Sequence, residues 1–277
     1  MSDDYTVVDL CQGAGWSRQA YYKAKANAER RKDRKEQMVE LVKKERARQP
    51  KLGTRKLQVV LREAMRQKGL RIGRDRFFDL LRQEDLLVKR PRRGVRTTNS
   101  RHGLGFYPNR YKEMIVTGPH QAWLSDLTYL RVGEGFMYLS LLHDAASRKV
   151  VGYALEAHLT ASGPLRALSM AMAQLPGGAA PLHHSDRGIQ YACHDYIAQC
   201  QARGLTISMT EQNHCYENAQ AERLNGILKQ EYGLDQWFQS RAQAQRAVDQ
   251  AVHLYNTCRP HTSLAYRTPA QVHRQVA

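Results

Sequence analysis

The sequence contains no run of 18 apolar residues, so it offers no segment long enough to cross a bilayer. Its first ten residues, MSDDYTVVDL, are acidic and lack the apolar core of a secretory signal. The five cysteines are scattered without a CxxC pair, a pattern that favours reduced thiols over a structural zinc site. We therefore expect a cytoplasmic protein without disulfides.

Acidic residues are scarce relative to basic ones: 43 Lys and Arg face 26 Asp and Glu, which gives a net charge of +17. The excess is concentrated in residues 1–119, which hold 30 basic and 14 acidic residues, whereas residues 120–277 hold 13 and 12. A surplus of this size indicates a polyanionic partner. No basic amphipathic helix with a broad apolar face stands out, so nucleic acid is favoured over a membrane surface.

Residues 1–50 are predicted to form an N-terminal helical region. Two short helices flank the turn Gly13–Gly15, and a charged helix follows over residues 28–48. A helix, a glycine-containing turn and a second helix are the elements of a helix-turn-helix. An ordinary helical hairpin would give the same pattern, so both interpretations stay open.

Residues 51–88 are predicted to form a helix-turn-helix unit that binds DNA. Apolar residues recur at helical spacing from Leu57 to Met65 and again from Phe77 to Leu81, with glycines between the two stretches. Arg74 and Arg76 would then remain free for phosphates or base edges. A plain helical hairpin is the alternative, and the surrounding positive charge favours the DNA-binding unit.

Residues 89–119 lack periodicity and form a basic linker. The stretch beginning KRPRRGVR contains proline, glycine and the closely spaced Arg90, Arg92 and Arg93. We expect this linker to lie along nucleic acid, although a solvated tether would have the same composition.

Residues 120–277 alternate between strand and helix patterns, which indicates an α/β domain. The two first strands are separated by Gly133-Glu134-Gly135, a hairpin signal. The predicted strands are 121–130, 136–143, 150–156, 181–185 and 205–209. The predicted helices are 165–175, 196–203, one starting at 219 after the N-cap Asn218, and 241–257.

Three carboxylates fall where these elements would bring them together. Asp126 lies within the first strand, Asp186 ends the fourth, and Glu222 lies on the helix that follows the fifth. Lys229 shares the helical face of Glu222, opposite the apolar face of that helix. Carboxylate oxygens suit Mg²⁺, and two such ions about 4 Å apart support phosphodiester chemistry. Three acids and a solvated helix face also occur by chance, so the local motifs must decide.

Those motifs resemble the insertion-sequence transposases of the IS3 type, within the retroviral-integrase-like DDE superfamily. The resemblance lies in WLSDLTY around Asp126, HHSDRGIQY around Asp186 and NAQAERLNGILKQE around Glu222. It includes the 35 residues that separate Asp186 from Glu222 and the segment YNTCRPHTSLAYRTPAQVH near the C-terminus. The chain departs from the family at Asn213-His214 and Glu217, which lie outside the triad.

The resemblance implies a ribonuclease-H-like catalytic core, an α/β fold with a mixed five-stranded sheet, preceded by an all-α helix-turn-helix region. It implies that Asp126, Asp186 and Glu222 are the catalytic acids and hold Mg²⁺ or Mn²⁺, as two ions. Lys229 and Arg187 would contact DNA. His183 is expected to be a structural histidine at a strand end, and Asp144 a supporting or surface acid.

The implied function is that of a DNA transposase that nicks the 3′ end of an insertion sequence and transfers the strand. The implied partners are double-stranded DNA, further copies of the chain on that DNA, and the product of an upstream reading frame, in the nucleoid of a bacterium. Two alternatives remain: a hydrolytic nuclease of the same fold, and a DNA-binding regulator of transposition without its own chemistry.

Overall fold

The computed structural model describes residues 6–88, 106–211 and 217–274. The chain divides into two compact units: a helical unit (Met1–Arg48 with Gly53–Val88) and a core unit (Gln49–Leu52 with Lys89–Ala277). The expected linker residues Arg90, Arg92 and Arg93 lie outside the described residues. None of the described helices is long and apolar enough to cross a membrane.

The helical unit contains one much longer helix than the sequence pattern suggested. We expected one helix to end near residue 27 and another to begin at 28, but α2 runs without interruption for 31 residues. The expected break was wrong because no glycine or proline occurs between Arg18 and Pro50. The helices of this unit are α1 (Val7–Gly13), α2 (Arg18–Arg48), α3 (Thr54–Gln67) and α4 (Arg74–Gln83).

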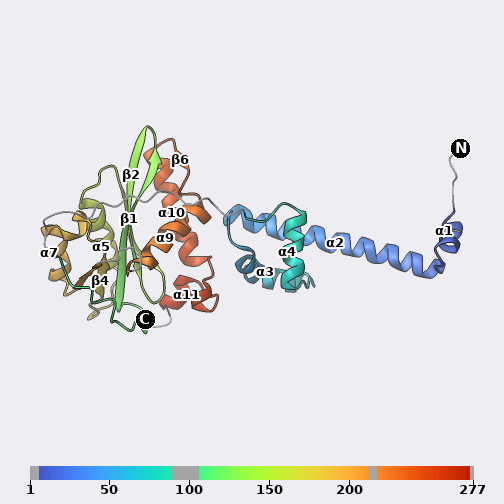
Figure 1. The fold of residues 1–277 in the computed structure, drawn as a ribbon, viewed down its shortest axis with the longest axis horizontal. Helices are drawn as coiled ribbons and strands as arrows, with labels where there is room; N and C mark the ends of the chain where they lie inside the picture. The colour runs from blue at the N-terminus through green and yellow to red at the C-terminus, as the bar shows by residue number, and fades with distance from the viewer. Residues whose placement is uncertain (1–5, 89–105, 212–216, 275–277) are drawn as a thin grey trace. The chain divides into compact units, whose positions relative to one another are not determined.

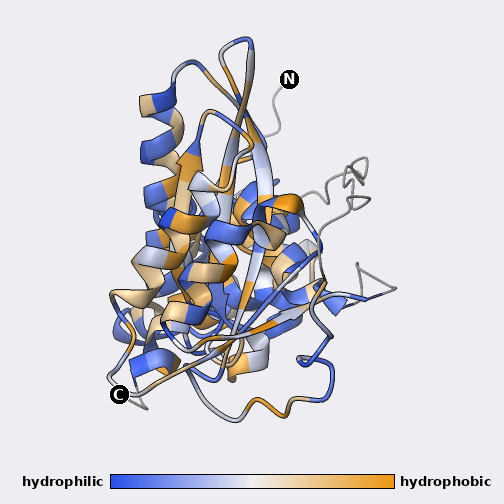
Figure 2. Ribbon diagram, turned by 90° about the vertical axis from the view of Figure 1, so that its left-hand side faces the viewer, coloured by the Kyte–Doolittle hydropathy of each residue, from blue (hydrophilic) through white to orange (hydrophobic). Residues whose placement is uncertain are grey.

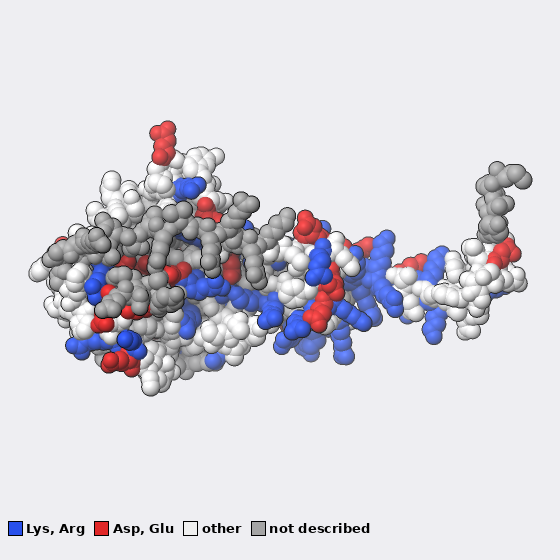
Figure 3. Space-filling view, viewed as in Figure 1, with Lys and Arg blue, Asp and Glu red and all other residues white. Residues whose placement is uncertain are grey.

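The small core of the helical unit follows the predicted apolar spacing. Leu57, Leu61 and Met65 of α3 are buried, as are Phe77 and Leu81 of α4. Much of the remaining surface of these helices carries charged side chains, and Figure 3 shows Lys and Arg gathered over α2, α3 and α4. This unit therefore presents a basic surface on a small apolar core.

A mixed sheet forms the centre of the core unit. Its strand order is β3-β2-β1-β4-β5; β2 is antiparallel to both of its neighbours, β1 and β3, whereas β4 is parallel to β1 and β5 is parallel to β4. The strands of this path are β1 (Ala122–Val132), β2 (Gly135–Asp144), β3 (Val150–Glu156), β4 (Leu182–Ser185) and β5 (Thr206–Met209).

The expected count of five strands was too small, because a sixth strand pairs with β1. The strand β6 (Trp237–Phe238) runs parallel to β1 opposite Arg131 and Val132, and Gly133 donates its N–H to the carbonyl of Phe238. A strand of two residues is too short to show an alternating pattern, so periodicity does not predict it.

Helices cover both faces of the sheet, and Figure 1 shows α5 and α7 on one side and α9 and α10 on the other. Trp123 and Leu142 pack among apolar residues of α5 and α7, whereas Leu130 and Met137 pack against α9 and α10. Along the helices hydrophobic and hydrophilic residues lie side by side, as expected of helices that bury one face (Figure 2). The helices are α5 (Ser162–Met172), α6 (Ile189–Ala192), α7 (His194–Ala202), α9 (Ala219–Tyr232) and α10 (Arg241–Thr257).

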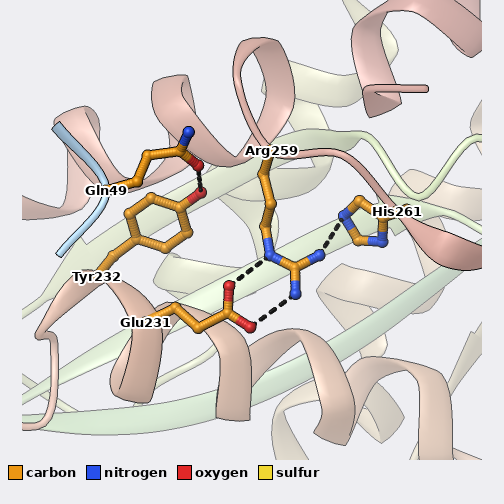
Figure 4. A network of polar contacts seen from close by, with 5 residues as sticks. All are labelled: Gln49, Glu231, Tyr232, Arg259 and His261. Carbon is orange, nitrogen blue, oxygen red and sulfur yellow. Dashed lines mark hydrogen bonds and ion pairs between the residues drawn. The ribbon is translucent and has the colours of Figure 1, made fainter. Parts of the chain in front are cut away.

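The C-terminal segment is fastened to α9 by a buried ion pair (Figure 4). Arg259 is 1% exposed, and its guanidinium makes two hydrogen bonds of 2.7 Å to the carboxylate of Glu231 on α9. Its third nitrogen lies 2.9 Å from Nε2 of His261. Tyr232 donates its hydroxyl proton to Gln49 in the same network of the core unit. Arg259 and His261 therefore hold the segment that carries η1 (Thr262–Leu264) and α11 (Pro269–Arg274).

Candidate active site

The parallel pairing of β1 and β4 brings Asp126 and Asp186 to neighbouring positions. Leu124 lies opposite His184 as the last pair of this register; Asp126 follows two residues later within β1, and Asp186 follows two residues later, just beyond the end of β4. Side chains two residues apart in a strand project from the same face. Asp186 comes directly after the end of β4, where Gly188 donates its N–H to Oδ1 at 3.0 Å. A Cβ at Gly188 would lie 3.0 Å from that same oxygen, so the turn leaves little room there.

Helix α9 is docked against β1 by its predicted apolar face and by two asparagines. Ala221, Leu224, Ile227 and Leu228 are buried, as the spacing predicted. Asn218 begins the helix without a side-chain cap, and its amide instead donates to the carbonyl of Ser125 at 3.1 Å.

Asn225 is the residue of this site that the sequence pattern did not reveal. Its amide nitrogen lies 2.6 Å from Oδ2 of Asp126, and its side chain is buried. It is one helical turn from Glu222, and it lies next to Leu224 on the border of the apolar face. The sequence feature that points to Asn225 is its position at the border of the apolar face, beside Leu224. A polar side chain buried there needs a hydrogen-bond partner.

The acidity of Asp126 shows how closely negative charge is gathered. The pKa of its carboxyl is raised from 3.8 to about 7. Removal from water is the largest cause, and the negative charges of Asp186 and Glu222 also contribute. The hydrogen bond from Asn225 acts in the opposite direction because it stabilises the ionised form. Mutual repulsion of three carboxylates is what a cation between them would relieve.

Glu222 is exposed on α9, in contrast to the partly buried Asp126 and Asp186. Among residues 6–88, 106–211 and 217–274, no three His, Cys, Asp or Glu side chains lie close enough together to enclose a metal ion. The oxygen donors nevertheless fit Mg²⁺ or Mn²⁺ in chemical type, because hard divalent ions prefer carboxylates and water. The electrostatic coupling of the three acids supports the same fit.

Lys229 lies near these acids, two turns beyond Glu222 on α9. Its ammonium is 4.6 Å from the centre of the Tyr129 ring, a distance typical of a cation–π contact. Partial burial lowers the pKa of Lys229, and the negative charge of Asp126 partly offsets this effect. The contact with Tyr129 was not evident from the sequence.

The other residues predicted to contact DNA are Arg187 of the core unit and Arg74 and Arg76 of the helical unit. Arg187 donates from Nε to the carbonyl of Thr210 at 2.6 Å, and its guanidinium lies 4.4 Å from the ring centre of Phe106. Arg74 and Arg76 are exposed on α4. The roles of these arginines in DNA binding stay predictions.

Asp144 and His183 are both buried and hydrogen-bonded within the core unit. Asp144 is fully buried, not on the surface, and accepts hydrogen bonds from the N–H of His120 and from Ser147. His183 is buried with Nε2 at 2.9 Å from Ser125 and 2.8 Å from the Tyr196 hydroxyl. Burial lowers the pKa of His183 to about 3, so it is neutral near pH 7.

Comparison with known proteins identifies the class to which this fold and these acids belong. Two models of the integrase core domain match residues 116–215 and 203–269. The insertion element IS600 uncharacterized 31 kDa protein of Shigella sonnei is 34% identical over 265 residues, covering 94% of this chain and 96% of that protein. The transposase InsF for insertion sequence IS3A of Escherichia coli (strain K12) is 33% identical over 193 residues, covering 69% of this chain and 67% of InsF.

Solved structures with a similar core are retroviral integrases. The HTLV-2 integrase catalytic core domain in complex with magnesium matches with 20% identity and a TM-score of 0.45, covering 56% of this chain and 97% of that one. A simian T-cell lymphotropic virus intasome in complex with a PP2A regulatory subunit matches with 18% identity and a TM-score of 0.49, covering 80% and 70%.

The core unit contains an integrase core domain, with helices on both sides of a mixed sheet. The chain belongs to the family of IS3-type insertion-sequence transposases. It is therefore a DNA transposase of the DDE polynucleotidyl transferase class.

Proposed function

We propose that Asp126, Asp186 and Glu222 are the catalytic acids of this transposase and that they hold two Mg²⁺ or Mn²⁺ ions. The observation that supports the proposal is the charge coupling of Asp126 to both other acids, together with the β1–β4 register, whose last pair, Leu124 and His184, lies two residues before each aspartate. Bound there, the metal supplies activation of an attacking oxygen and stabilisation of the leaving oxygen in phosphodiester chemistry.

The chain's own residues orient the DNA and the acids. Asn225 holds one carboxylate oxygen of Asp126 through a hydrogen bond of 2.6 Å. Lys229 places a positive charge beside this site, where it would bind a phosphate of the strand being cut. Arg187, Arg74 and Arg76, with Arg90, Arg92 and Arg93 of the linker, would bind further phosphates.

The proposed reaction has two steps, 3′-end nicking and strand transfer. Water attacks the phosphodiester at the end of the element, which frees a 3′-hydroxyl. That hydroxyl then attacks a phosphodiester of the target DNA and displaces a second 3′-hydroxyl. The first step breaks one phosphodiester bond by hydrolysis. The second step breaks one phosphodiester bond of the target and forms one new phosphodiester bond in its place.

Two partners follow from this reaction. Pairing of two element ends requires more than one active site, so we propose that copies of the chain assemble on DNA. An upstream-frame product, as a fusion or a separate chain, is a further proposed partner in the bacterial nucleoid.

A strand-transfer assay on labelled element-end DNA tests the assignment with Glu222→Gln. The variant is expected to bind end DNA within about twofold of the wild type and to lose at least roughly 10³-fold in joining rate, because a ligand of the reacting centre is removed. Asp195→Asn is the matched control, since Asp195 is an acid whose side chain is 82% exposed on α7. Joining by Glu222→Gln at the wild-type rate would refute the role of Glu222.

A further inference from the structure

The end of the sheet beyond Asp126 carries aromatic and basic side chains on a single face. Tyr129 pairs directly with Tyr138, and Arg131 pairs with Phe136 on one side and with Trp237 on the other. Directly paired residues project from the same face, and so do residues two apart in a strand. We name this surface the distal sheet face, formed by Tyr129, Arg131, Phe136, Tyr138 and Trp237.

The distal sheet face is exposed although its reverse side is buried. Tyr129 is 37%, Phe136 52% and Trp237 56% exposed. The intervening pair, Leu130 and Met137, points to the opposite face and is buried against α9 and α10. Figure 1 shows the β1–β2 hairpin extending past α5, the helix that covers the neighbouring part of this sheet. Several large exposed aromatic residues on one surface indicate a binding site.

The aromatic rings of this face have a defined arrangement. Tyr129 and Phe136 meet edge to face with ring centres 5.1 Å apart, and Trp237 donates its indole N–H to the carbonyl of Gly133 at 2.7 Å. These contacts fix the rings and leave part of each ring in solvent. Rigid, exposed rings are suited to stacking with flat ligands, because little side-chain entropy is lost on binding.

Positive charge accompanies the rings and connects them to the acids. Lys229 lies over Tyr129, and Arg131 is close enough to lower the pKa of Lys229 through charge repulsion. Tyr129 and Asp126 are three residues apart in β1 and project from opposite faces, so the link between them is Lys229, which lies over the Tyr129 ring and interacts electrostatically with Asp126. Aromatic rings interleaved with cations are the combination that binds single-stranded nucleic acid, where bases stack and phosphates are neutralised.

We propose that the distal sheet face stacks unpaired nucleotides of the DNA strand whose end is processed at the carboxylates. The inference rests on the proposed function, because it takes the reacting strand to lie at Asp126. Lys229 and Arg131 neutralise the phosphates, and Phe136 and Trp237 offer ring surfaces to the bases. A symmetric contact with a second copy of the chain is disfavoured, since it would bring the same cations of both copies together.

The test measures binding of two end duplexes, one blunt and one with three unpaired nucleotides that carry 2-aminopurine, with Ca²⁺ in place of Mg²⁺. Phe136→Ala is expected to weaken binding of the unpaired end about tenfold and to reduce 2-aminopurine quenching, whereas binding of the blunt duplex changes less than twofold. Phe136→Leu is expected to behave like Phe136→Ala, because leucine keeps apolar bulk and lacks a ring.

Tyr266→Ala is the matched control, because Tyr266 is also 37% exposed and lies in the C-terminal segment. Recovery of binding in Phe136→Leu, or an equal loss with both duplexes, overturns the stacking proposal. So does a change of oligomeric state in sedimentation without a change in quenching. A wild type that quenches 2-aminopurine but joins no strands refutes the transposition chemistry alone, and the reverse result refutes the stacking site alone.

Discussion

At the scale of single residues, the site depends on how the carboxylate of Asp126 is balanced. Burial and two neighbouring acids favour its protonated form, while the amide of Asn225 favours the ionised form. The pKa of about 7 means that the folded protein holds a proton on Asp126 that the unfolded chain releases near pH 4. Ionisation of Asp126 therefore lowers the free energy of unfolding, and a bound cation would offset this loss.

Replacement of Asp126 by Asn should change the pH dependence of stability. Since the folded pKa is raised, the folded state binds more protons between about pH 4 and pH 7, and stability falls as pH rises through that range. Without divalent ions, Asp126→Asn should exceed the wild type in unfolding free energy at pH 8 by on the order of 1–3 kcal/mol, and by less at pH 5.

Denaturant unfolding at both pH values, with and without Mg²⁺, measures this difference. Mg²⁺ should stabilise the wild type at pH 8 more than Asp126→Asn, because only the wild type presents all three acids. Equal pH dependence and equal response to Mg²⁺ in the two proteins would contradict the coupling of Asp126 to its neighbours.

At the scale of elements, close approach of backbones fixes the layers that carry the site. Gly152 of β3 lies against α5, where a Cβ would come 1.9 Å from the carbonyl oxygen of Ala167 and 3.2 Å from the Cβ of Ala171. Only glycine permits this spacing between strand and helix. The separation of α5 from the sheet is therefore set by one residue.

Substitution of Gly152 by Ala should be strongly destabilising for this reason. The methyl group would force β3 and α5 apart, and we expect a loss of about 3 kcal/mol or more in unfolding free energy, at the upper end for overpacked cores. Thermal denaturation measures the change. Gly177→Ala is the control, since no atom lies within 4 Å of its Cβ position, and a comparable loss in both variants would argue against the close-packing explanation.

At the scale of the whole molecule, positive charge and acidic chemistry belong to different parts of the chain. The first 119 residues hold 30 of the 43 basic residues, while the three proposed catalytic acids all lie after residue 120. Phosphate contacts made by a basic unit release counterions, so DNA affinity depends steeply on salt. The helical unit is expected to dominate binding and the core unit to dominate chemistry.

Removal of a phosphate contact in the helical unit should therefore reduce the salt dependence of DNA binding. Arg76→Gln on α4 is expected to make the slope of log K against log salt shallower by about 0.9 and to leave joining at saturating DNA unchanged. Fluorescence anisotropy between 50 and 200 mM salt, roughly the range over which such effects are large, measures it. Arg66→Gln is the control, because Arg66 is paired with Glu63 at 2.8 and 2.9 Å, and an equal slope change there would contradict a specific role of Arg76.

The sequence by itself predicted most of the elements and pointed to the three acids that we propose as catalytic. Alternating and helical spacings gave the strands around Asp126 and the apolar face of α9, because local periodicity records which face of each element is buried. The 35-residue interval between Asp186 and Glu222, with its local motifs, predicts the family. The continuity of α2 also follows from the sequence, because residues 18–49 contain no helix breaker.

Only the tertiary structure decided which side chains meet. The bond from Asn225 to Asp126, the position of Lys229 over Tyr129 and the pairing of β6 with β1 join residues separated by about a hundred positions in the chain. Local periodicity carries no information about such pairs, because they depend on strand order and on how far a helix approaches the sheet. The distal sheet face became visible for the same reason, once the register of β1 with β2 and β6 set its aromatic and basic residues on one surface.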